Sequence, residues 1–162
     1  MNLKEYKIQV ALGTMSDNDK YKIAMNENTI KLLEYLSKDK NYYIRYWIAR
    51  NENTPIELLE YLSRDKNYYV KSSVAMNENT PIRILKILSR DKNYIVRCNV
   101  ACNKNTPIEI LKKLSKDEEW NVRRCVASNK NTPIKVLKLL SKDKDNDVSD
   151  KAKETLYGLE RI

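Results

Sequence analysis

The phrase Asn-x-Asn-Thr-Pro-Ile-x-x-Leu recurs along this chain at a spacing of 26 residues. A shorter version that lacks the proline starts at Asn26. Repetition with a period of 20–50 residues is typical of solenoids, in which each unit buries its apolar face only against its neighbours. The full-length copies start at Asn51, Asn77, Asn103 and Asn129.

Each unit has the signals of two short helices. In the second unit, Thr54 is expected to be an N-cap, Pro55 the first helical residue and Glu57 the partner in a capping box. The apolar stripe of this helix comprises Ile56, Leu58, Leu59 and Leu62. A polar turn then interrupts the stripe, and a second helix is expected from Tyr68 to Asn77. Two helices per unit, with only two glycines among 162 residues, predict an all-α solenoid.

The repeat phase also predicts the organisation of the chain. Terminal units of a solenoid need caps, because one of their faces has no neighbour. We therefore expect an N-terminal cap with a degenerate half-repeat, five tandem helical repeats and the end of a C-terminal capping helix. The expected segments are residues 1–25 for the N-terminal cap, repeats at 26–50, 51–76, 77–102, 103–128 and 129–154, and 155–162 for the end of the capping helix.

An acidic and a basic residue lie six positions apart in four successive units. Stacking of the units would place these residues in two adjacent ladders, which can pair within and between units. Asp143 continues the acidic column but is followed by Ser149 in place of a base. We interpret the columns as structural rather than catalytic. The four pairs are Asp39/Arg45, Asp65/Lys71, Asp91/Arg97 and Asp117/Arg123.

The run Val-Arg-x-x-Val-Ala-x-Asn-x-x-Thr-Pro-x-x-x-Leu-x-x-Leu-Ser-x-Asp, from Val96 to Asp117, resembles the leucine-rich repeat variant family. The resemblance extends over about residues 18–150 and implies a right-handed α-solenoid akin to HEAT and armadillo arrays, with a binding role and no activity. Some relatives carry a cysteine cluster for an iron–sulfur centre ahead of the repeats. Residues 1–25 contain no cysteine, so we expect no such cofactor here.

The residue content argues against an enzyme. The chain has no histidine, which removes the commonest general base and metal ligand at neutral pH. Cys98, Cys102 and Cys125 can approach one another and are possible zinc ligands. No fourth ligand is evident, however, so we interpret them as small buried thiols in the reduced state. We expect no catalytic residue, no metal and no cofactor.

The sequence also carries expectations about location. The first twenty residues contain charges throughout, and no apolar run approaches the ~20 residues of a membrane span. Three cysteines within helical segments are typical of a reducing compartment. We therefore expect a cytoplasmic protein that acts without a membrane or a small-molecule substrate.

The net charge of +9 lies mostly in the last three units. In the first helix of the earlier units an acid stands four residues before a base, as in Glu34/Lys38 and Glu60/Arg64, which is the favourable orientation. From the third unit onward the acid is replaced by lysine. The like-charged pairs predict a basic face that binds a partner, with a merely solvated face as the alternative. The face comprises Lys86, Arg90, Lys112, Lys116, Lys138 and Lys142.

The second helix of each unit contains the positions that vary most, and in helical-repeat arrays this helix commonly lines the concave groove. We predict a partner-binding groove with aromatic residues near one end and a base near the other. A repeating aromatic column, Tyr42, Tyr68, Tyr94 and Trp120, is interpreted as packing between units, although stacking on nucleic acid bases is the alternative. The predicted groove residues are Tyr46, Trp47, Ser72, Ser73, Asn99 and Arg124.

Two functions are compatible with these features. The first is a non-enzymatic adaptor or inhibitor that holds an acidic protein or a nucleoprotein through the groove and the basic face. The second is a nucleic-acid-binding protein that acts mainly through phosphate contacts. The sequence favours the first, because solenoids most often bind proteins.

Overall fold

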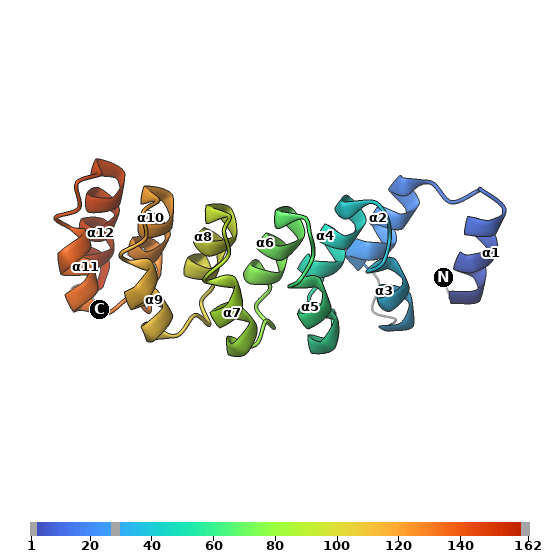
Figure 1. The fold of residues 1–162 in the computed structure, drawn as a ribbon, viewed down its shortest axis with the longest axis horizontal. Helices are drawn as coiled ribbons and strands as arrows, with labels where there is room; N and C mark the ends of the chain where they lie inside the picture. Colours follow the sequence, from blue (N-terminus) through green and yellow to red (C-terminus); the bar gives the residue numbers. More distant parts are fainter. Residues whose placement is uncertain (1–2, 27–29, 160–162) are drawn as a thin grey trace. The chain divides into compact units, whose positions relative to one another are not determined.

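The computed structural model describes residues 3–26 and 30–159, and within these ranges every regular element is a helix (Figure 1). The chain forms two compact units, Met1–Thr80 and Pro81–Ile162. The predicted start of the first repeat and the end of the chain fall partly on residues 27–29 and 160–162, outside the described residues. The first unit contains α1 (Leu3–Ala11), α2 (Asp17–Asn26), α3 (Ile30–Leu36), α4 (Tyr42–Arg50), α5 (Ile56–Leu62) and α6 (Tyr68–Met76).

The second unit continues the same pattern of a seven-residue helix followed by a longer one. Its helices are α7 (Ile82–Leu88), α8 (Tyr94–Cys102), α9 (Ile108–Leu114), α10 (Trp120–Ser128), α11 (Ile134–Leu140) and α12 (Asn146–Leu159). The prediction of an all-α array of helix pairs, repeated every 26 residues, is confirmed. We refer to α3, α5, α7, α9 and α11 as the first helices, and to α4, α6, α8 and α10 as the second helices.

The start of each first helix differs from the prediction. Thr54 is not an N-cap, because its hydroxyl donates to the carbonyl oxygen of Ile48 in the preceding helix. Pro55 is the capping residue, and no side chain caps the helix. The predicted capping box with Glu57 is absent, since the Thr54 N–H donates to the carbonyl of Asn51 at 3.1 Å. The threonine column therefore closes the preceding helix rather than opening the next one.

The second helices start at a side-chain cap. The side chains of Asn41, Asn67 and Asn93 accept hydrogen bonds from the backbone N–H two residues later, as expected of N-cap asparagines. In each of these turns the aspartate two residues before the capping asparagine accepts a hydrogen bond from its backbone N–H. The Asn67 N–H, for example, donates to Asp65 Oδ1 at 2.8 Å. The polar turn between the two helices is thus held by its own side chains.

The core of each unit consists of branched apolar side chains. In the first unit, α2 packs against α4 and α4 against α6, and in the second unit α8 packs against α10 and α10 against α12. Leu59 and Val74 are fully buried in the first unit, as are Leu111 and Val126 in the second. Helices of seven and nine residues are too short to be stable alone, so their stability depends on this packing.

The N-terminal segment packs through α2 against α3 and α4, and its organisation as a cap with a degenerate half-repeat stays a prediction. Lys20 on α2 forms an ion pair with Asp39 at 3.0 Å, in the place that the repeat base takes in later units. Ahead of it, α1 docks through the buried Tyr6, whose ring meets that of Tyr35 edge-on at 5.4 Å between centroids. Gly13, with a φ of 67°, supplies the left-handed turn after α1.

The acid–base columns form ion pairs between successive repeats. Arg45 Nε lies 2.7 Å from Asp65 Oδ2, and its Nη2 donates to Asp65 Oδ1 at 3.0 Å. The same guanidinium donates to the carbonyl of Asp39 at 2.7 Å. For Arg45, Arg97 and Arg123, the pairing within a repeat is therefore to the backbone, and the pairing to a carboxylate is to the next repeat. Arg97–Asp117 and Arg123–Asp143 repeat this geometry, each at 2.7 Å.

This arrangement explains why Asp143 has no base in its own repeat. It accepts the two-point hydrogen bond from Arg123 of the preceding repeat. A base at position 149 would have no aspartate 20 residues further on to pair with among the described residues. The hydrogen bonds from Arg123 hold the pKa of Asp143 below its usual range. Burial raises the pKa of Asp65 and of Asp117, but the hydrogen bonds of their arginines and of a backbone N–H outweigh burial and lower it.

A second ladder of side chains was not predicted. Asn77 ends α6, and its amide Nδ2 donates to the carbonyls of Ala49 at 2.9 Å, in the last turn of α4, and of Asn51 at 3.1 Å, in the loop after α4. Asn129 makes the equivalent bonds to Ala101 and Asn103. These buried asparagines therefore link the loop backbone of one repeat to that of the next.

Candidate functional site

The predicted basic face lies within the second unit, on its three first helices. Lys86 is on α7, Lys112 on α9 and Lys138 on α11, with Arg90, Lys116 and Lys142 in the turns that follow these helices. All six side chains are exposed. Within the described part of the chain, none of the six forms an ion pair. Unpaired cations therefore face solvent on three successive repeats.

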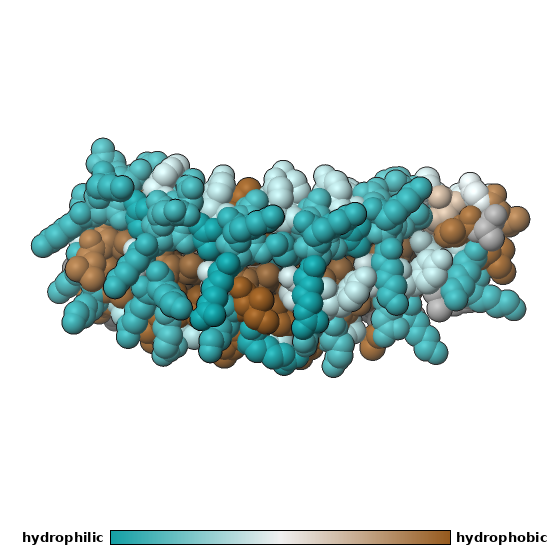
Figure 2. Space-filling view, viewed as in Figure 1, coloured by the Kyte–Doolittle hydropathy of each residue, from teal (hydrophilic) through white to brown (hydrophobic). Residues whose placement is uncertain are grey.

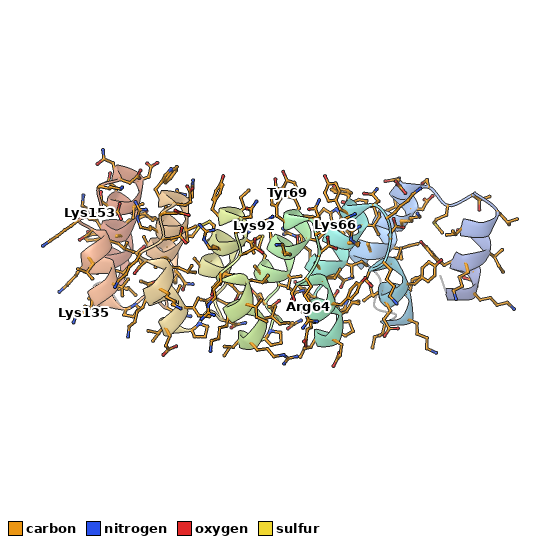
Figure 3. All side chains as sticks on the ribbon, viewed as in Figure 1. Arg64, Lys66, Tyr69, Lys92, Lys135 and Lys153 are labelled. Carbon is orange, nitrogen blue, oxygen red and sulfur yellow. A yellow bond between two sulfur atoms is a disulfide. The ribbon has the colours of Figure 1, made fainter. Side chains whose placement is uncertain are left out.

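The first unit has a different charge pattern on the equivalent helix. Glu60 and Arg64 form the predicted pair at 3.1 Å, with the Arg64 side chain 69% exposed. The equivalent pair predicted for α3, Glu34 with Lys38, does not form an ion pair among the described residues. Figure 3 labels Arg64 beside α5 and Lys135 on α11. The exposed first-helix surface is thus partly neutralised in the first unit and basic in the second.

Apolar side chains accompany the basic face, which the sequence reading missed. The isoleucine after each proline was assigned to the buried stripe with Ile56 as the example, but Ile56 is 43% exposed. In the second unit the equivalent residues and two others on the first helices are also exposed. Figure 2 shows brown apolar atoms between teal polar side chains. The exposed set in the second unit is Ile82, Ile87, Ile108, Ile134 and Leu139.

The helical period explains this exposure. Ile134 and Lys138 are four residues apart, so they share one side of α11. Together with Lys135, Leu139 and Lys142 they line a surface depression of about 450 Å³. The basic face is therefore a mixed surface, in which exposed cations lie beside exposed isoleucine and leucine side chains.

The predicted groove residues differ in how much of their side chains is exposed to solvent. Ser72 and Ser73 on α6 are buried, at 6% and 0% exposed, which leaves little of either side chain for a partner to contact. Their small size lets neighbouring helices pack closely at this position. Asn99 on α8 is half-buried and Arg124 on α10 is exposed; both belong to the second unit. The predicted gradient from aromatic to basic residues along the whole array stays a prediction.

Tyr46 and Trp47 belong to an aromatic cluster in the first unit, which we define as Tyr21, Tyr43, Tyr46 and Trp47. Tyr21 and Tyr43 stack with ring centroids 5.8 Å apart, and Tyr46 meets Trp47 edge-on at 5.1 Å. The Arg50 guanidinium lies over both Tyr46 and Trp47, at 5.9 Å and 5.7 Å from the ring centroids. This combination of rings and a cation is one that binding sites use.

The indole of Trp47 is also notable for its polar atom. Its Nε1 is buried and has no hydrogen-bond partner among the residues that the structure describes, although a buried indole N–H normally has one. Trp47 and Arg50 line a depression of about 240 Å³ together with Met25, Asn51, Glu52 and Asn53. The aromatic column is partly exposed as well: Tyr42 is 42% exposed and stacks on Tyr69 of the next repeat at 6.0 Å.

The cysteines differ from the prediction of three reduced thiols. Cys98 on α8 and Cys125 on α10 form a disulfide, with their Cα atoms 5.7 Å apart, and Cys102 is free and exposed. Two neighbouring second helices bring them together: Cys98 and Cys102 lie one turn apart on α8, and Cys125 follows Cys98 by one repeat plus one residue. The three sulfur atoms all lie within 4.8 Å of one another.

Comparison with known proteins identifies the fold. A solved structure described as a leucine-rich repeat variant with a novel repetitive protein structural motif aligns with a TM-score of 0.50 and 22% sequence identity. The alignment covers 93% of this chain and 71% of that one. No family model and no curated protein matches the sequence. The chain therefore has the fold of a leucine-rich repeat variant, as the resemblance of its repeats predicted.

The helices were also compared with what a membrane span requires. None of those in the described part of the chain has the length and apolar character needed to cross a lipid bilayer.

Proposed function

We propose that this protein is a non-enzymatic binding module, an adaptor or inhibitor that holds an acidic protein or a nucleoprotein. The main contact surface in this proposal is the basic face, with the exposed isoleucine and leucine side chains beside it. Tyr46, Trp47, Asn99 and Arg124 on the second helices provide further contacts. The single observation that supports the proposal best is the alignment of unpaired cations on three successive first helices of the second unit.

Two physical arguments favour a partner over a solvated face. Like-charged residues four apart on a helix destabilise it slightly, and large exposed apolar side chains add nothing to solubility. Both features recur on α7, α9 and α11 of the second unit. Apolar and basic residues scattered over a surface by chance would not recur at equivalent positions of successive repeats. An acidic surface with apolar side chains of its own would complement both of them.

Charge reversal on the first helices tests the proposal. In the triple variant Lys86→Glu, Lys112→Glu, Lys138→Glu, each new glutamate stands four residues before a base, so we expect the fold to be as stable as before or slightly more stable. Binding to a glutamate-rich peptide, measured by fluorescence anisotropy, should fall at least about tenfold and lose much of its salt dependence.

The matched control is Lys92→Glu, Lys130→Glu, Lys144→Glu. These three lysines are exposed in loops of the same unit, and the control changes the net charge by the same amount. We expect it to weaken binding less, because none of these three lysines belongs to the basic face. Equal losses in the two triple variants would show a general charge effect, and unchanged affinity in the first variant would show a merely solvated face.

A specific observation favours a second candidate, single-stranded nucleic acid. The aromatic cluster of the first unit combines stacked rings with Arg50, and aromatic platforms of this kind bind bases while cations hold phosphates. Titration with a single-stranded oligonucleotide at about 50 mM and 200 mM salt separates the two candidates, since phosphate binding weakens steeply with salt. Affinity for the oligonucleotide that depends on Trp47, with none for acidic peptide, would favour the second.

A further inference from the structure

We propose that the three cysteines of the second unit form a binding site for a thiophilic divalent cation, with Zn²⁺ as the probe, once the Cys98–Cys125 disulfide is reduced. The site would bridge α8 and α10, two helices of one compact unit. It involves neither the basic face nor the aromatic cluster, and Arg124 is the one contact residue of the proposed function that lies beside it.

The geometry of the sulfur atoms supports a single-ion site. The three Sγ atoms lie within 4.8 Å of one another. A zinc–thiolate bond is about 2.3 Å long, so three sulfurs on one tetrahedral ion stand about 3.8 Å apart. Cys102 therefore has to approach by about 1 Å, a distance within reach of a side-chain rotation, and the two disulfide sulfurs separate once their bond is broken.

The chemical steps balance without any unnamed reagent. A dithiol reductant transfers two electrons and two protons to the disulfide, giving thiols on Cys98 and Cys125 and a disulfide on the reductant. Binding of the cation then displaces protons from the three thiols, because thiolates are the ligands. Soft thiolate ligands favour zinc over hard cations such as magnesium or calcium.

The surroundings of the cluster suit an ion with three thiolates, which carries one negative charge overall. The Arg124 guanidinium lies near the Cys102 thiol. The same guanidinium would offset the charge of the complex. Cys102 is exposed, so water can reach the fourth coordination position. Binding should therefore strengthen as pH rises and protons are lost.

The array itself supplies suitable test variants. Replacing each cysteine by serine introduces a residue that another repeat already has in the same column: Ser72 for Cys98, Ser128 for Cys102, and Ser73 for Cys125. Each of these serines lies in a second helix of the structure. The three single variants are therefore expected to keep the fold, which circular dichroism would verify.

Zinc uptake by the whole chain tests the proposal. The reduced protein, freed from reductant under anaerobic conditions, should bind one Zn²⁺ per chain in competition with a chromophoric chelator, and Co²⁺ should give a thiolate-to-cobalt charge-transfer band. The oxidised protein should bind none. Cys102→Ser should weaken zinc binding more than about tenfold while leaving the disulfide intact in the oxidised protein.

Two outcomes would overturn the proposal. The first is a reduced, folded protein that takes up no zinc at concentrations at which zinc–thiolate sites fill. The second is uptake that is the same in Cys102→Ser, Cys98→Ser and the unaltered chain, because non-specific binding to surface carboxylates would then account for it. A raised melting temperature of the reduced protein on addition of zinc, absent in the three variants, would support a folded site.

Discussion

At the scale of single residues, the ion pairs between repeats are the most specific interactions in the molecule. Arg97 and Asp117 are each about one-tenth exposed, and the guanidinium uses its other nitrogen on the carbonyls of Asp91 and Lys92. Removing one partner of a well-buried pair leaves a charge without compensation, which is costly. The two-point geometry also fixes how neighbouring turns meet, so the pair specifies the stacking as well as stabilising it.

Substitution of Asp117 measures this contribution. We expect Asp117→Ala to lower the free energy of unfolding by about 2–3 kcal/mol, because Arg97 would keep its backbone bonds but lose its carboxylate. Urea unfolding followed by circular dichroism gives the value. The control is Asp150→Ala, whose side chain is 72% exposed in a pair with Lys153, and which should lie within about 0.5 kcal/mol of the unaltered protein. Equal effects would contradict a special role for the buried pair.

The residue scale also shows what the sequence could predict. The acidic and basic columns were evident because both members repeat, and Asp143 without a base was correctly taken as the end of the column. The roles of Thr54 and Asn77 could not be predicted from the sequence. A threonine before a proline is compatible with an N-cap, and only the structure shows its hydroxyl bonded to the carbonyl of Ile48. Asn77 bonds to a neighbouring repeat, which no pattern within one repeat reveals.

At the scale of helices, each element is shorter than an isolated helix needs to be, so its stability comes from its neighbours. The first helices bury three side chains of seven, as in α9, where Ile110, Leu111 and Leu114 are buried. Their opposite sides remain open to solvent with isoleucine and lysine. Periodicity predicted the buried leucines. The isoleucine after the proline was placed in the same stripe, but the helical period puts Ile108 beyond the edge of the side that Ile110 and Leu111 bury.

Two substitutions in α9 separate core from surface. Leu111→Ala should reduce the free energy of unfolding by about 2–5 kcal/mol, since this side chain is fully buried and its removal leaves a cavity. Ile108→Ala on the same helix should cost less than about 1 kcal/mol, because Ile108 is 44% exposed. Urea unfolding of both variants provides the comparison. A large loss for Ile108→Ala would mean that its side chain is covered in the folded protein.

The disulfide is a covalent link between two second helices, and it closes a loop with a sequence separation of 27. In the chain-entropy account, a loop of this length stabilises the folded state by about 3–4 kcal/mol. Reduction with a dithiol in the presence of a metal chelator should therefore lower the urea midpoint. Oxidised Cys102→Ser should match the oxidised unaltered protein, because Cys102 is outside the bond. An unchanged midpoint after verified reduction would contradict this prediction.

At the scale of the whole molecule, the same ion pair recurs from repeat to repeat, so its pH dependence should be summed over the chain. Hydrogen bonds and arginine charges hold the pKa of Asp65, Asp117 and Asp143 below the usual range. A carboxyl group with a lower pKa in the folded than in the unfolded state adds stability above its unfolded pKa of about 4. That stability is lost as pH falls through the folded value.

The absence of histidine from the chain removes the side chain that ordinarily titrates between pH 5 and 8. We therefore expect the urea midpoint to be nearly constant from about pH 5 to 8 and to fall steeply below about pH 4, as the folded protein must take up protons on several buried carboxylates. The variant Asp117→Asn, which has one fewer of these carboxylates to protonate, should start from lower stability at pH 7 but lose less between pH 5 and pH 2. An equal loss in both proteins would show that repulsion among the positive charges, rather than protonation of the paired aspartates, governs acid unfolding.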